Sequence, residues 1–95
     1  MNFQDFKTSL QGHSVPPSVA GGLLAMWYDG KGDWNKAHDI AQELHTSEGS
    51  WIHAYLHRKE GDAGNAAYWY HRANQPVCKT SLNQEWEDIV KALLH

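Results

Sequence analysis

Two stretches of this chain repeat one pattern at an offset of 29 residues, and this repeat constrains the fold more than any single motif. Residues 23–44 read LLAMWYDGKGDWNKAHDIAQEL, and residues 52–73 read IHAYLHRKEGDAGNAAYWYHRA. Each stretch contains a small residue, then a Gly-Asp pair, then an alanine at the same spacing. Two helices that pack across a short turn need such residues at these places, so the repeat predicts paired helices.

Apolar residues recur every three or four positions along the whole chain, and no segment alternates with a period of two. The pattern predicts an all-α fold of five or six short helices, arranged as stacked antiparallel hairpins. The predicted helices span residues 2–11, 17–28, 34–45, 47–61, 63–73 and 81–94. We expect one domain over residues 1–95, with repeat units at 17–46 and 47–76. The last helix is expected to cover the open end of the stack, as repeat arrays require.

The turns between the predicted helices carry the residues that helix ends require. Gly32 and Gly61 each follow a helix, and Asp33 and Asp62 come directly after them. A carboxylate accepts hydrogen bonds from the free N–H groups of a first turn, so both aspartates are expected to cap the next helix. Ser81 is expected to cap the last helix. The string DGKGD lacks the later acidic ligands of a calcium loop, and we interpret it as a turn.

Composition excludes several classes of protein. A formal net charge of −3 gives no general attraction to nucleic acid or to an anionic membrane surface. The single cysteine, Cys78, excludes an internal disulfide and a cysteine-based zinc site. No run reaches the ~20 apolar residues of a membrane span, and the first residues lack the pattern of a signal peptide. We therefore expect a soluble cytoplasmic protein without a cofactor.

The repeated unit resembles the tetratricopeptide repeat and its Sel1-like relatives over residues 17–76. The second unit matches their pattern of small, turn and aromatic residues at Ala54, Gly61, Asp62, Ala66, Tyr70 and Ala73. The first unit matches it at Leu24, Ala25, Tyr28, Gly32, Asp33 and Ala37. The offset is shorter than the usual length of about 34 residues, and His53 and His57 stand at positions where these families have apolar residues. The whole chain also resembles short bacterial proteins of no assigned activity.

The resemblance implies a right-handed superhelix whose first helices line a concave face that binds peptides or partner proteins. The matching positions are Trp51, Tyr55 and Arg58 in the second unit, and Met26 and Asp29 in the first. Two rings and an arginine on one face form a plausible binding surface. Trp51 and Tyr55 also lie at the centre of an apolar arc, so core and groove both remain open for them.

A second surface is expected on the helix over residues 63–73. Its wheel places Tyr68 and Arg72 outward, where they can contact a partner or a second copy of the chain. The sequence thus predicts a small, non-catalytic protein–protein interaction module, with a homodimer as one arrangement. No nucleophile elbow or phosphate-binding loop occurs, so catalysis finds no support.

The alternative is a metal site. His53 and His57 stand at positions i and i+4, so they share one helix face, and Glu60 lies on the same face. The third ligand would be Glu60, or His71 or His38 from another helix. The segment HAYLH does not match the zinc-protease motif, which needs Glu directly after the first His. Surface or packing roles for these histidines remain the plain alternative.

The cationic residues of the second repeat also stand out. Both arginines of the chain, Arg58 and Arg72, fall in it, together with His57, Lys59 and His71. Because the two helices end at opposite ends of a hairpin, these five residues are not all expected to converge. Cations near the C-terminus of a helix complement its dipole, and an anion or acidic-partner site is the other interpretation. The overall acidic balance argues against nucleic acid as the partner.

Overall fold

The computed structural model describes residues 1–94, and this part of the chain contains six helices and no strand. The helices are α1 (Phe3–Ser9), α2 (Gly22–Gly30), α3 (Trp34–Gln42), α4 (Ser47–Lys59), α5 (Ala63–Arg72) and α6 (Leu82–Leu93). The predicted all-α fold is confirmed; His95, the last position of the predicted domain, lies outside the described residues. No described helix is both long enough and apolar enough to cross a membrane.

The two Gly-Asp turns have the same conformation. Gly32 and Gly61 adopt φ values of 84° and 89°, in the left-handed region that favours glycine. In both turns the N–H of the following aspartate donates at 2.9 Å to the carbonyl five residues earlier. The glycine N–H donates to the carbonyl three residues before it, at 2.9 Å and 3.1 Å. These paired bonds define a Schellman motif, so the repeat consists of equivalent joints.

The predicted helix caps are also confirmed. Asp33 and Asp62 have nearly identical backbone angles, with φ of −100° and −98° and ψ of 77° in both. Each carboxylate accepts a hydrogen bond from the N–H three residues later, at 3.1 Å and 3.2 Å. Ser81 accepts from the N–H of Gln84 at 3.0 Å and begins α6.

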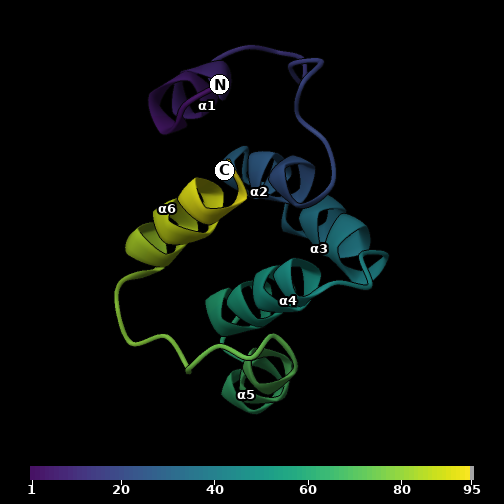
Figure 1. The fold of residues 1–95 in the computed structure, drawn as a ribbon, viewed down its shortest axis with the longest axis vertical. Coiled ribbons are helices and arrows are strands. Elements are labelled where there is room, and N and C mark those ends of the chain that lie inside the picture. Colours follow the sequence, from purple (N-terminus) through teal and green to yellow (C-terminus); the bar gives the residue numbers. More distant parts are fainter. Residues whose placement is uncertain (95) are drawn as a thin grey trace.

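The helices form two hairpins, α2–α3 and α4–α5, and α4 contacts both helices of the first hairpin (Figure 1). The sequence led us to expect that α6 covers the end of this stack, but it does not. It packs mainly against α2 and α4, and α1 packs on its outer side. The reason is its apolar stripe: Trp86, Ile89 and Val90 join the same core as the inward faces of α2 and α4. The hand and curvature of a tetratricopeptide-like superhelix stay a prediction.

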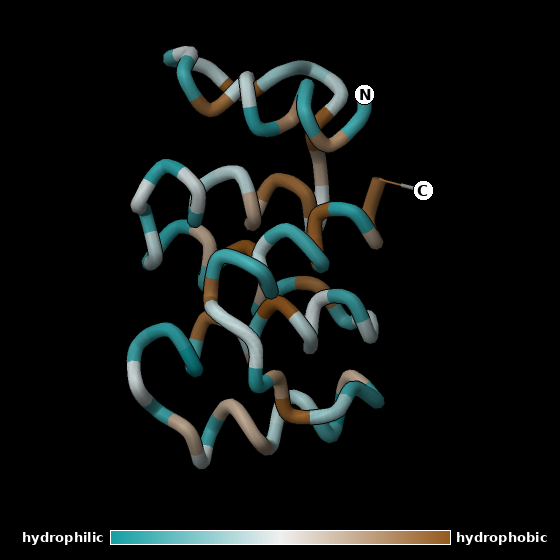
Figure 2. The backbone as a smooth tube through the Cα atoms, turned by 90° about the vertical axis from the view of Figure 1, so that its left-hand side faces the viewer, coloured by the Kyte–Doolittle hydropathy of each residue, from teal (hydrophilic) through white to brown (hydrophobic). Residues whose placement is uncertain are grey.

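The core lies between α2, α4 and α6. Met26, Ile52, Leu56 and Ile89 are fully buried there. Figure 2 shows apolar stretches of the tube in the middle of the molecule and hydrophilic ones at most of the turns. Gly22 marks one close approach, because a Cβ atom at this position would lie 3.0 Å from the side chains of Ile52 and Leu93.

Three helix boundaries differ from the prediction. The helix expected over residues 17–28 begins only at Gly22, because Gly21 has φ of 59° and ends the preceding turn. Helix α1 is shorter than residues 2–11 and begins after the capping residue Asn2. Helix α3 ends at Gln42 rather than near residue 45, since the chain turns so that the Leu44 backbone passes close to Gly49.

Candidate metal centre

Three imidazoles meet where α3 packs on α4. His38 comes from α3, and His53 and His57 come from successive turns of α4. The ring centroids are 4.6 Å apart for His38 and His53, 5.3 Å for His38 and His57, and 4.8 Å for His53 and His57. One nitrogen from each ring lies within 4.8 Å of the other two. The three residues thus form a group that we call the histidine cluster.

Local sequence explains how the cluster forms. The four-residue spacing in α4 places two imidazoles on one face, as the sequence predicts. On α3, the small residues Ala37 and Ala41 are buried, so this helix approaches α4 closely and brings His38 against the pair. Of the three candidates for a third ligand, His38 is the one that lies beside both His53 and His57. Its position in the first repeat corresponds to Ala67 in the second, so the repeat itself gave no signal for it.

Two tryptophans hold the cluster on opposite flanks. The ring of Trp34 stacks on His38 at 4.9 Å and 13°, and the ring of Trp69 stacks on His53 at 3.9 Å and 13°. The indole N–H of Trp34 donates to the carbonyl of Leu56 at 2.8 Å, which fixes that ring on α4. The imidazoles are therefore positioned by three helices, because Trp69 belongs to α5.

Burial favours the neutral form of His38 and His53. His53 and His57 are only 6% and 7% exposed. The pKa of His53 is lowered from 6.5 to about 4, chiefly because burial disfavours the imidazolium and further because His38 and His57 lie beside it. The pKa of His38 is lowered for the same reasons, although Asp39 and Glu60 act in the opposite direction. Neutral imidazoles keep the lone pair that a metal ion needs.

A carboxylate orients His57. Its Nδ1 lies 2.6 Å from Oε1 of Glu60, and its Nε2 lies 3.5 Å from the side-chain amide of Asn65. An ionised carboxylate only accepts, so Nδ1 donates in this contact; in the neutral ring, Nε2 then has the lone pair and can accept from the Asn65 amide. Glu60, which the sequence suggests as a ligand, therefore stands beside His57 and outside the histidine cluster. With Asp62 it forms a second, exposed group of possible ligands around His57.

The residues expected to line a concave groove lie in the interior instead. Met26, Asp29 and Tyr55 are 0%, 4% and 2% exposed, because α6 covers the face of α2 and α4 that would form the groove. Of the two roles left open for Tyr55, the structure shows the core. Asp29 accepts from the Tyr55 hydroxyl at 2.7 Å and from Lys59 at 2.9 Å, so its charge is paired.

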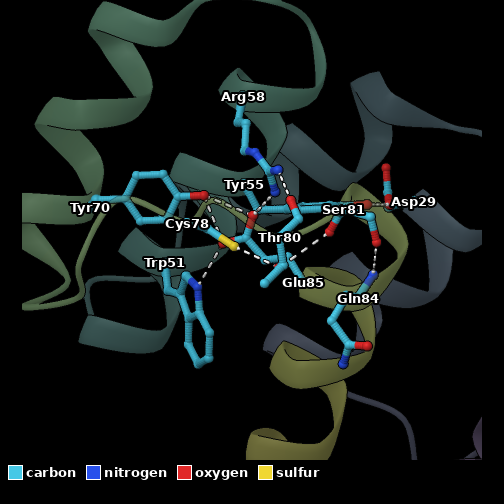
Figure 3. A network of polar contacts seen from close by, with 10 residues as sticks. All are labelled: Asp29, Trp51, Tyr55, Arg58, Tyr70, Cys78, Thr80, Ser81, Gln84 and Glu85. Carbon is cyan, nitrogen blue, oxygen red and sulfur yellow. Dashed lines mark hydrogen bonds and ion pairs between the residues drawn. The ribbon is translucent and has the colours of Figure 1, made fainter.

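Trp51 and Arg58, the other two expected groove residues, bind Glu85 on α6 (Figure 3). The Trp51 indole donates to this carboxylate at 3.2 Å, Arg58 at 2.8 Å, and the Tyr70 hydroxyl lies 2.7 Å and 2.8 Å from its two oxygens. Glu85 is 1% exposed. Sequence reasoning missed this role, since the only local signal was an acidic residue in the first turn of α6.

The cationic residues of the second repeat lie apart, as expected for the opposite ends of a helical hairpin. Arg58 and Lys59 each pair with a buried carboxylate, of Glu85 and Asp29 respectively, rather than with the helix dipole alone. Arg72 is exposed near the end of α5, where its guanidinium is 5.2 Å from the Trp69 ring and donates to the Tyr68 hydroxyl at 3.0 Å. Tyr68 is 54% exposed, so both residues of the second expected surface do face outward.

Comparison of the chain with models of protein families, with curated proteins and with solved structures finds no match. The function must therefore be inferred from the chemistry of the residues that the fold brings together.

Proposed function

We propose that this protein binds a divalent transition-metal ion, zinc or a metal with similar preferences, through the histidine cluster. The observation that supports it is the convergence of three imidazole nitrogens from two helices within 4.8 Å. The histidine pair of α4 was the basis of the metal alternative, and His38 supplies the third ligand that the pair lacked.

Imidazole nitrogen suits zinc, copper and nickel, and three histidines with one open position form a known type of zinc site. Zinc–nitrogen bonds of about 2.0–2.1 Å would place the three nitrogens about 3.4 Å from one another. The rings must therefore draw together by rotation about their side-chain bonds.

The bond between His57 and Glu60 is the second support. Histidines that bind metal usually donate their other N–H to a carboxylate or carbonyl, which fixes the tautomer and makes the ligand more basic. Glu60 makes this contact at 2.6 Å and leaves Nε2 of His57 with its lone pair.

A titration with Co²⁺ tests the proposal, because cobalt replaces zinc and its visible absorption reports tetrahedral coordination. We expect saturation at one equivalent per chain and displacement of cobalt by Zn²⁺. His38→Ala should abolish this binding, while His71→Ala, which changes an exposed histidine outside the cluster, should not. Thermal melting of each variant shows that it remains folded. An absence of stoichiometric binding by the wild-type protein would refute the proposal.

A second candidate function is protein–protein contact through the outer face of α5. Tyr68 is more than half exposed, and the guanidinium of Arg72, which is also exposed, lies 5.8 Å from its ring. Aromatic and arginine side chains are enriched in protein interfaces. Sedimentation velocity of the wild type against Tyr68→Ser tests this with a second copy as partner. A dimer that Tyr68→Ser dissociates would support it; a monomer at all concentrations would exclude self-association.

A further inference from the structure

A cavity of about 450 Å³ lies next to the histidine cluster. Its wall is formed by the end of α3 and the turn after it, by the first turns of α4, and by the last turns of α5. His53 lines this cavity together with Trp69 and Arg72. Because His53 belongs to both the cavity and the cluster, a molecule in the cavity would lie beside a metal ion held there.

The charges of the residues that line the cavity favour a negatively charged ligand. Arg72 is the side chain in its lining that is always ionised, and no carboxylate is among the lining residues. Glu43 and Glu48 are neighbours in sequence but exposed, and they do not line it. A guanidinium presents several N–H donors in one plane, which matches the geometry of carboxylate and phosphate groups.

The first turn of α4 adds further donors. Thr46 caps the helix by accepting from the N–H of Gly49 at 3.0 Å. The N–H groups of Ser47 and Glu48 bond to no other described group, and the positive end of the helix dipole lies at this point. Ser47 and Ser50, which carry hydroxyl groups, also line this cavity.

His53 gives the independent observation that a ligand belongs here. His53 is 94% buried, and its imidazole makes no hydrogen bond with any described group. Within residues 1–94, every fully buried side-chain nitrogen or oxygen has a hydrogen-bond partner. Because the nitrogens of His53 have none, they are not fully buried and must reach open space. A buried polar ring that faces a cavity without a partner is poised to bind a metal ion or a ligand.

We infer that the cavity binds a small oxyanion, a carboxylate or phosphate group, that completes the coordination of the metal ion at His53. In this arrangement Arg72 and the first N–H groups of α4 donate to the oxygens that do not touch the metal. The inference rests on the proposed metal site, and it names the class of ligand that the open coordination position receives.

An NMR titration tests this inference. Inorganic phosphate and, separately, acetate are added to ¹⁵N-labelled protein loaded with zinc and to protein freed of metal with EDTA. We expect saturable shifts of the Ser47 and Glu48 amides, with affinity at least tenfold greater in the zinc-loaded protein. Phosphate and acetate distinguish the two sources of the oxyanion, and choline, a cation, should cause no shift.

Arg72→Gln should weaken phosphate binding by about tenfold, since it removes a charged donor and keeps a polar side chain. Lys36→Gln, which removes an exposed cation on α3 away from the cavity, should leave the affinity unchanged. Zinc binding without any saturable anion binding would overturn this inference and leave the metal site in place. Equal anion affinity with and without zinc would also overturn it, whereas failure of the cobalt titration would refute the metal site itself.

Discussion

At the scale of single residues, two buried carboxylates and three imidazoles set the chemistry of the molecule. Glu85 receives hydrogen bonds from Trp51, Arg58 and Tyr70, so its charge is satisfied although it is 1% exposed. The histidine cluster is the opposite case, because two of its rings are buried and the third is half-buried, with few hydrogen-bond partners. Groups of the first kind stabilise the fold, and groups of the second kind are where ligands are bound.

Glu85→Gln is expected to lower the free energy of unfolding by up to about 3 kcal/mol, because it leaves the half-buried Arg58 without its counter-charge. The matched control is Glu87→Gln, two residues later in the same helix. Glu87 pairs with Lys91 on the surface, and its loss should cost no more than about 0.5 kcal/mol. Urea unfolding measures both values, and a similar small cost for both would show that the Glu85 network contributes little.

The stability of the metal-free protein should fall as the pH drops from 6.5 to about 4. The pKa of His53 is lower in the folded state than its ordinary 6.5, so the unfolded chain binds more protons in this window. The stabilisation from His53 is complete above pH 6.5 and is lost by about pH 4, a change of at most about 3.4 kcal/mol.

His53→Gln isolates this effect, because glutamine does not titrate while the other groups around the cluster, His38, His57, Asp39 and Glu60, are unchanged. Unfolding by urea in the presence of EDTA at several pH values should show a shallower pH dependence for the variant. Identical pH dependence in both proteins would show that His53 titrates near its ordinary pKa.

At the scale of helices, local signals decide where most elements begin and end. The two Gly-Asp joints, the aspartate caps and Ser81 were all predictable from residues adjacent in sequence. The starts of α1 and α2 also have local causes, the cap at Asn2 and the positive φ of Gly21, although the spacing of apolar residues did not reveal them. Packing is different: Gly22 faces Ile52 and Leu93, which lie far along the chain. The same holds for the cluster, since the α4 pair follows from local spacing but His38 depends on how two helices pack.

Gly32→Ala and Gly61→Ala should each lower the free energy of unfolding by about 1–2 kcal/mol, because alanine is strained at positive φ. Equal costs would reflect the equivalence of the two joints. Gly64 is the control: it lies in the first turn of α5, and a Cβ atom there would meet nothing within 4 Å. Gly64→Ala should raise stability by about 0.4–1 kcal/mol. Thermal melting that ranks the three variants otherwise would contradict this account of the joints.

At the scale of the whole molecule, α6 decides what the surface offers. It fills the face of α2 and α4 that a repeat of this type was expected to leave open, and the Trp86 indole donates to the Met26 carbonyl across 60 residues of sequence. No local pattern reports such a contact, which is why the groove was expected and the covered face was not. The sites proposed above therefore lie on α3, the start of α4, and α5.

Because α6 joins both hairpins, the chain should unfold in one cooperative step. Far-ultraviolet circular dichroism and tryptophan fluorescence, followed in urea, should give the same midpoint. An array of independent hairpins would instead give two transitions, and separate midpoints for the two signals would contradict the central position of α6.

The most direct test of the central claim is X-ray absorption at the zinc edge of protein loaded with one equivalent of zinc. The account predicts a first shell of three imidazole nitrogens and one further light atom at about 2.0–2.1 Å. His38→Ala should lose one imidazole from this shell or fail to retain zinc. A shell of water oxygens alone, or a spectrum that His38→Ala leaves unchanged, would contradict the histidine cluster as a metal centre.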